Sequence, residues 1–254
     1  MNVAQTAKGL DAIDGDGAHV KRILPSYHLG YLDPFLLFDH FTVQKPAGFP
    51  SHPHRGFEII TYMLEGAFLH ADNRGNQKMI LAGGLQRITS GSGIVHSEMP
   101  GSNGVNRGLQ LWINLPRSDK GMEPSYQDVA AADLPVVERQ GVRRKILVGE
   151  GSPVRVSRPM RYEDVTLFAQ SVEVGMQVPV PALFRAFLYV LDGVGKFGGT
   201  MTRAEAGEIV SFDPPPSQGF IDVQAERADL PLRFIYVAGL PIGERPLFRG
   251  SYVD

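Results

Sequence analysis

Two short motifs carry the residue types in this sequence that could bind a metal ion. One intervening residue separates His52 from His54, and one separates His96 from Glu98. Side chains two residues apart on an extended strand point to the same face. If the two strands face each other, three imidazoles and one carboxylate surround a single point. Neutral imidazole and carboxylate groups suit Fe, Mn, Co, Ni, Cu and Zn, so the motifs predict one site for a divalent transition metal.

The competing explanation is that the motifs are polar ends of two unrelated strands. A lone His-x-His motif would be weak support for a metal site. Here a His-x-Glu motif follows several predicted strands and brings the set to four ligands, a number that proteins commonly supply to such metals. We therefore interpret His52, His54, His96 and Glu98 as one site.

Composition bounds the class of protein. The chain has 254 residues, 43% hydrophobic and 20% charged, which indicates a soluble globular protein of one large or two ordinary domains. A net charge of −2 predicts no nucleic-acid partner, which would need a basic stripe. Without cysteine, the chain has no disulfide and no thiolate ligand. We see no signal-peptide pattern and no apolar run of membrane-spanning length, so we expect a cytoplasmic protein that does not enter a membrane.

Short apolar runs separated by glycine and proline predict an all-β chain with few short helices. A polar, turn-rich segment over residues 117–138 interrupts these runs and contains a predicted short helix at residues 130–132. We place a domain boundary there. The predicted domains are residues 1–130, with the metal site, and residues 131–254.

An internal repeat supports two similar units. Tyr62-Met63-Leu64-Glu65-Gly66 matches Tyr189-Val190-Leu191-Asp192-Gly193 at an offset of 127 residues. The same offset places Pro179 and Pro181 where His52 and His54 stand. The chain contains no histidine after His96. The second unit is therefore predicted to lack metal ligands.

Several motifs together resemble the pirin family of bicupins, densely in the first half and mainly in strand layout in the second. They are Leu32-Asp33-Pro34-Phe35, His52-Pro53-His54-Arg55-Gly56-Phe57-Glu58, Gly93-Ile94-Val95-His96-Ser97-Glu98, Leu109-Gln110-Leu111-Trp112-Ile113-Asn114-Leu115-Pro116 and Met122-Glu123-Pro124. The resemblance implies two cupin (jelly-roll) β-barrels packed face to face, with one metal in the N-terminal barrel. It implies Fe(II) as the usual metal and His52, His54, His96 and Glu98 as its ligands.

A second carboxylate competes for the fourth position. Glu58 lies where the general cupin pattern has a ligand, and the strand period puts it on the face of His52 and His54 if no bulge intervenes. The pirin resemblance assigns the position to Glu98 instead. In that case we expect Glu58 to orient a ligand histidine. A simpler role for Glu58 is an ion pair with Arg55.

The resemblance also implies a function. Bacterial members of the family include quercetin 2,3-dioxygenases, and animal members are nuclear cofactors of transcription factors. We expect an oxidoreductase that cleaves flavonols with dioxygen, binding the substrate 3-hydroxyl at the metal with Glu98 as the base. The alternative is a metal-dependent regulatory protein with a protein partner and no dedicated substrate. An isomerase or lyase is a further alternative, because one fold hosts many chemistries. We expect a monomer.

Two further groups of residues have predicted roles. Five are predicted to line the pocket, with core packing as the alternative for the apolar ones: Phe38, Phe57, Met63, Met99 and Gln110. Three histidines are predicted to be structural rather than ligands: His28, His40 and His70.

Overall fold

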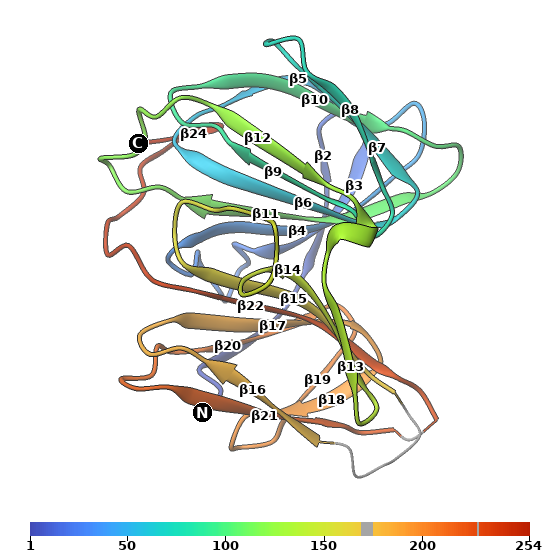
Figure 1. Cartoon of the computed structure of the whole chain (residues 1–254), viewed down its shortest axis with the longest axis vertical. Helices are drawn as coiled ribbons and strands as arrows, with labels where there is room; N and C mark the ends of the chain where they lie inside the picture. The colour runs from blue at the N-terminus through green and yellow to red at the C-terminus, as the bar shows by residue number, and fades with distance from the viewer. Residues whose placement is uncertain (169–174, 228) are drawn as a thin grey trace.

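The protein consists of β-sheets arranged in two stacked halves (Figure 1). The computed structural model describes residues 1–168, 175–227 and 229–254. Each half contains a seven-stranded and a four-stranded antiparallel sheet. The predicted all-β fold of two face-to-face cupin barrels is confirmed. The single helical turn in the described residues is the 3-10 turn η1 (Ala131–Asp133).

The first half carries the two histidine motifs. In spatial order, its seven-stranded sheet contains β12 (Ser125–Val129), β9 (Leu85–Thr89), β6 (Phe57–Glu65), β11 (Asn106–Asn114), β4 (Phe35–Val43), β3 (Ala18–Leu24) and β2 (Leu10–Asp14). Its four-stranded sheet contains β5 (Phe49–His54), β10 (Ile94–Pro100), β7 (Ala67–Asp72) and β8 (Gln77–Leu81).

The second half repeats this layout. Its seven-stranded sheet contains β1 (Gln5–Lys8), β20 (Glu208–Phe212), β17 (Arg185–Asp192), β22 (Leu232–Gly239), β15 (Met160–Leu167), β14 (Val142–Val148) and β13 (Val136–Arg139). Its four-stranded sheet contains β16 (Gly175–Val180), β21 (Gly219–Ala225), β18 (Val194–Phe197) and β19 (Thr202–Glu205). The short strands β23 (Phe248–Arg249) and β24 (Tyr252–Val253) pair with each other near the C-terminus.

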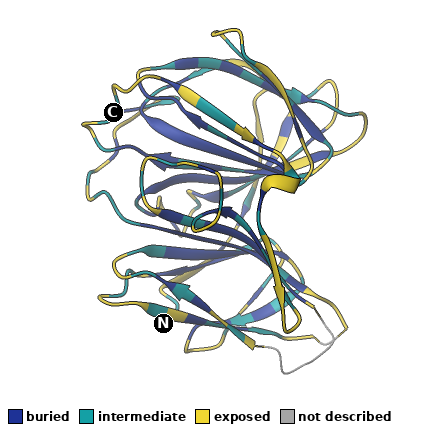
Figure 2. Cartoon of the chain, viewed as in Figure 1, coloured by how far each residue is buried: buried dark blue, intermediate teal, exposed yellow. Residues whose placement is uncertain are grey.

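The two halves join through an aromatic core between their large sheets. The strands of these two sheets are coloured mostly as buried in Figure 2. Phe38 of β4 packs 5.3 Å from the ring of Phe187 and 5.5 Å from that of Tyr189, both on β17. All three rings are buried, and burying such side chains is the main favourable term in folding. Phe38 therefore belongs to the core between the halves, and its predicted place in the pocket wall is wrong.

Each end of the chain packs against the half that the opposite end of the sequence forms. Strand β1 pairs with β20 in the second half, although it lies at the start of the chain. Val253 of β24 is fully buried in a core cluster with Phe57 and Ile59 of the first half. The division near residue 130 stays a prediction. Among the described residues, no helix is long and apolar enough to cross a membrane.

Candidate metal centre

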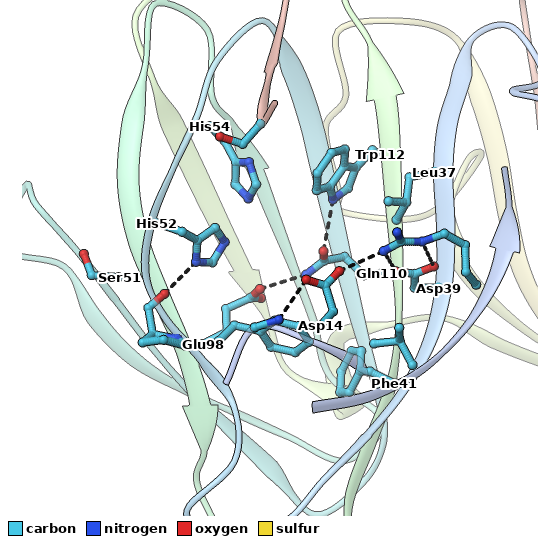
Figure 3. Close-up of a pocket in the computed structure, with 16 residues that line it drawn as sticks. Asp14, Leu37, Asp39, Phe41, Ser51, His52, His54, Glu98, Gln110 and Trp112 are labelled. Carbon is cyan, nitrogen blue, oxygen red and sulfur yellow. Dashed lines mark hydrogen bonds and ion pairs between the residues drawn. The ribbon is translucent and has the colours of Figure 1, made fainter. Parts of the chain in front are cut away.

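Strands β5 and β10 bring the two histidine motifs together. They pair antiparallel, with His96 opposite His52 and Ile94 opposite His54. One ligand nitrogen from each of His52, His54 and His96 lies within 4.8 Å of the other two. In Figure 3, His52 and His54 point into the same pocket that Glu98 lines. The alternating period of the two strands thus produces the predicted convergence of the three imidazoles.

The protonation state of two of the imidazoles, His54 and His96, fits a divalent cation. Burial lowers the pKa of His54 to about 3 and that of His96 well below its ordinary value, and the neighbouring histidines add to the shift. Both rings are therefore neutral near pH 7, and each keeps a lone pair. Two buried atoms, His54 Nδ1 and His96 Nε2, have no hydrogen-bond partner among the described residues. Leaving a buried polar atom without a partner lowers the stability of the fold. A metal ion bound by the two nitrogens would give each of them a partner.

Two further contacts orient the rings. His52 Nδ1 lies 2.7 Å from the carbonyl oxygen of Pro50, so Nδ1–H donates there and Nε2 is left for a metal. His96 Nδ1 lies 3.2 Å from Nε2 of His70, which is fully buried on β7. A metal-binding histidine usually has its second nitrogen held in this way.

Glu98 is held beside the histidines but is not part of their close group. Alternate residues of β10 are buried, so Glu98 shares the face of His96 as predicted. Thr61 Oγ1 donates to Glu98 Oε1 at 3.0 Å, and Gln110 Nε2 donates to Oε2 at 2.7 Å. A carboxylate has about four lone-pair sites, so these two bonds leave acceptor capacity on both oxygens. The assignment of Glu98 as fourth ligand stays a prediction.

Glu58 makes no hydrogen bond to the three converging histidines. The chain turns at Gly56, whose φ is +88°, and Glu58 then lies on β6 in the other sheet. Its carboxylate accepts hydrogen bonds from the Thr89 hydroxyl at 2.7 Å and from the Ser157 backbone N–H and hydroxyl at 3.0 Å. The prediction that Glu58 orients a histidine is wrong, because the turn breaks the strand period on which it rested.

The simpler role for Glu58 is wrong as well. The guanidinium of Arg55 pairs with Asp254 at 2.6 Å instead of with Glu58. Glu58 thus joins β6 to β9 and to the segment that carries Ser157.

A cavity of about 370 Å³ extends from the histidines across the face of β11. This volume lies at the lower end of the range for small-molecule pockets. Its walls are apolar at Leu37, Phe41 and Trp112, and Asp39, which pairs with Arg22, lies between Leu37 and Phe41 on the same face of β4 (Figure 3). Ser251, from the C-terminal segment, also lines it.

The predicted pocket neighbours divide into two sets. Gln110 lines the cavity, and Phe57 supports it by stacking on Trp112 at 4.4 Å. Met63 lies in a core cluster with Phe68, and half-buried Met99 alternates with the inward residues of β10. For these two methionines core or opposite-face packing replaces the predicted pocket role.

Of the three histidines predicted to be structural, His70 contacts the candidate site. His28 is exposed, and His40 Nδ1 lies 3.0 Å from the Tyr189 hydroxyl. His70 stands opposite Glu98 in the β7–β10 pairing, which brings its ring to His96. The pairing of β7 with β10 was the missing information, because His70 has no histidine two residues away to mark it.

The second half carries apolar side chains at the corresponding positions. Strands β16 and β21 pair as β5 and β10 do, with Val178 opposite Ile221 and Val180 opposite Gly219. Val178, Val180 and Ile221 are buried in the core of that half. The offset of 127 residues pointed to Pro179 and Pro181, one residue away. A slip of one residue exchanges the two faces of a strand.

Comparisons with known proteins agree with this architecture. The family model described as Pirin matches residues 17–113. A pirin-like protein of Arabidopsis thaliana is 43% identical over 94% of this chain and 80% of its own length. Human pirin is 36% identical over 94% of this chain and 83% of its own length. A crystal structure of quercetin 2,3-dioxygenase from Acinetobacter baumannii has a TM-score of 0.86 and 27% identity, covering 99% of this chain and 91% of that one. On these similarities, together with the shared fold, the chain belongs to the pirin family.

Proposed function

We propose that this pirin is a metal-dependent dioxygenase that cleaves flavonols such as quercetin. The observation that carries the proposal is the set of three converging imidazoles, two of which line a cavity with apolar walls. The similarity to the quercetin 2,3-dioxygenase of Acinetobacter baumannii supports the substrate class.

His52, His54 and His96 would hold one divalent metal, with Glu98 as the fourth ligand. Fe(II) is our first candidate, and Mn, Co, Ni, Cu and Zn suit the same donor atoms. When bound, the metal would supply Lewis acidity that favours loss of a proton from a substrate hydroxyl group, and it would supply the redox chemistry needed with dioxygen.

The chain's own residues bind the flavonol and move its proton. Leu37, Phe41 and Trp112 offer apolar and aromatic surface to a flat aromatic substrate and keep water from it. Glu98 accepts the proton of the 3-hydroxyl as general base. Thr61 and Gln110 hold its carboxylate in place meanwhile.

The charges of the cavity wall favour a neutral substrate. Arg22 is bound by Asp39 through Nε at 3.1 Å and Nη2 at 2.8 Å, and the same Nη2 lies 2.8 Å from Asp14. Together with Glu98, carboxylates outnumber the one guanidinium among these lining residues. A divalent metal at the histidines would balance this excess, so an uncharged polyphenol would meet no unbalanced charge in the cavity.

The proposal is tested by oxygen uptake and carbon monoxide release. Protein loaded with Fe(II) should consume dioxygen with quercetin and release carbon monoxide, and the His52→Ala/His54→Ala variant should not. A flavone without the 3-hydroxyl should not turn over, because it lacks the proton that Glu98 accepts. Equal rates with the two flavonoids would refute the mechanism. No uptake after loading with Fe, Mn, Co, Ni or Cu would refute the activity.

A regulatory role without a dedicated substrate is the second candidate. The observation that favours it is that similar curated proteins, including the human one, are named pirin or pirin-like and not dioxygenase. In this case the metal state would alter a protein-binding surface. A pull-down that compares metal-loaded with metal-stripped protein tests it, and it requires a partner that prefers one of the two forms.

A further inference from the structure

A directed chain of hydrogen bonds reaches Glu98 from Trp112. Trp112 Nε1–H donates to Gln110 Oε1 at 3.0 Å, and Gln110 Nε2–H donates to Glu98 Oε2 at 2.7 Å (Figure 3). Gln110 and Trp112 are two residues apart on β11, so both face the cavity. Neither of these two hydrogen bonds involves the three histidines.

The indole fixes which way the amide of Gln110 points. An indole N–H can only donate, and an ionised carboxylate can only accept. Gln110 therefore has its oxygen toward Trp112 and its nitrogen toward Glu98. The reverse orientation would place two donors together at one end and two acceptors together at the other. The amide has one favourable orientation as long as the indole N–H is present.

The indole is itself held on two sides. Its ring stacks on Phe57 at 4.4 Å, with 28° between the planes. Its edge contact with the imidazole of His54 has a centroid distance of 4.9 Å. Phe57 is fully buried, so the position of the indole is set by packing before any ligand arrives.

We propose that Gln110, oriented by Trp112, is a positioning residue that holds Glu98 in the geometry needed at the metal centre. Thr61 donates a hydrogen bond only to Oε1 of Glu98. Without the Gln110 amide, the carboxylate can therefore rotate about that one remaining hydrogen bond. The catalytic part of this inference rests on the proposed function. The effect on metal binding does not rest on it.

The first variant, Gln110→Met, keeps the length of the side chain and removes its donor. Contacts of this kind to a ligand are worth about 10–100-fold in metal affinity or activity, so we expect a loss in that range. The second, Trp112→Phe, keeps an aromatic ring but removes the N–H together with part of the indole surface, which lets the amide turn over. We expect a smaller loss, of up to about 10-fold.

The control is Phe197→Leu, at a fully buried ring in the core of the second half, which lowers stability without touching Gln110, Trp112 or the histidines. Affinity for Ni²⁺ or Co²⁺ is measured by competition with a chelator, and the unfolding midpoint is measured on the same samples. Weaker metal binding in Gln110→Met and Trp112→Phe, but not in Phe197→Leu at comparable stability, supports the proposal. If metal affinity follows the unfolding midpoint in all three variants, the role is structural and the proposal is overturned.

Kinetics separate this inference from the proposed function. If the wild-type protein oxidises quercetin, Gln110→Met should lower kcat and leave KM nearly unchanged, because it acts on Glu98 and not on the apolar walls. Trp112→Phe should lower kcat and also raise KM, because Trp112 forms part of the apolar wall. If the wild-type protein has no activity but the metal affinities change as expected, the proposed function fails and the positioning role stands. Unchanged metal affinity and unchanged kcat in both variants would overturn the positioning role alone.

Discussion

His70 Nε2 lies 3.2 Å from His96 Nδ1, and both rings are buried. The contact occupies the nitrogen of His96 that lies away from the unpaired Nε2. It therefore selects which nitrogen of His96 is presented to a metal. A histidine that seemed structural in the sequence thus controls the orientation of a candidate ligand.

We expect His70→Phe to weaken metal binding by about 10–100-fold, because a buried aromatic ring is kept there but the hydrogen bond to His96 is lost. Chelator competition measures the change. His28→Ala, at an exposed histidine elsewhere, is the matched control and should bind metal as the wild type does. Wild-type affinity in His70→Phe would show that the 3.2 Å contact has no role in metal binding.

Metal content should be one ion per chain. The His52→Ala/His54→Ala variant should lose it, because two of the three converging imidazoles are removed. Elemental analysis of the purified protein measures the ratio. Two tightly bound ions per chain, or metal retained by the double variant, would contradict the single site.

Glu58→Gln and Glu98→Gln should have separate effects. Glu58 accepts buried hydrogen bonds from Thr89 and Ser157, so its substitution should lower the free energy of unfolding by about 1–3 kcal/mol and leave metal affinity unchanged. Glu98→Gln should reduce metal affinity or turnover, because the amide oxygen is neutral. Urea unfolding and chelator competition on both variants test the pair. A loss of metal affinity in Glu58→Gln would contradict the structural assignment.

His40 should make the protein sensitive to acid. Burial, and then the positive charges of Arg107 and Lys21, lower its pKa to about 4 from the ordinary 6.5. Below pH 6.5 the unfolded chain binds this proton more readily than the folded protein does. Its contribution to stability is therefore complete above pH 6.5 and is lost as the pH falls through 4.

The shift corresponds to at most about 3 kcal/mol. Unfolding free energies measured from pH 7 to pH 4 should decline less steeply in His40→Gln than in the wild type. The exposed His28→Gln control should follow the wild type. Equal slopes for His40→Gln and the wild type would rule out a contribution from His40.

Gly56 should be required for docking of the C-terminal strand. A Cβ at Gly56 would lie 1.9 Å from the carbonyl oxygen of Val253, and φ there is +88°. Gly75 has nearly the same φ, +87°, but a Cβ there would meet nothing within 4 Å. Gly75→Ala should therefore cost only the backbone strain, about 1–2 kcal/mol, whereas Gly56→Ala should cost more. Limited proteolysis should also cut the C-terminal segment of Gly56→Ala sooner, and equal stability of the two variants would contradict this.

Local features of the sequence were sufficient to predict the strands and the convergence of three of the site residues. The period of two along β5 and β10 set His52 beside His54 and turned His96 inward, because alternation is a property of each strand alone. The all-β fold likewise followed from short apolar runs between turns, and the pirin resemblance supplied the arrangement of two barrels.

Tertiary structure decided what lies across from each strand. Glu58 lies away from the three histidines because the chain passes from one sheet to the other after Gly56. The alternation of residues within a strand does not indicate that change. His70 reached His96 through the pairing of β7 with β10, and Val253 reached the first half from the far end of the chain. The alternation of side chains is local and can be counted in a sequence. The pairing of strands joins residues distant in the chain, and it is fixed only when the whole core packs.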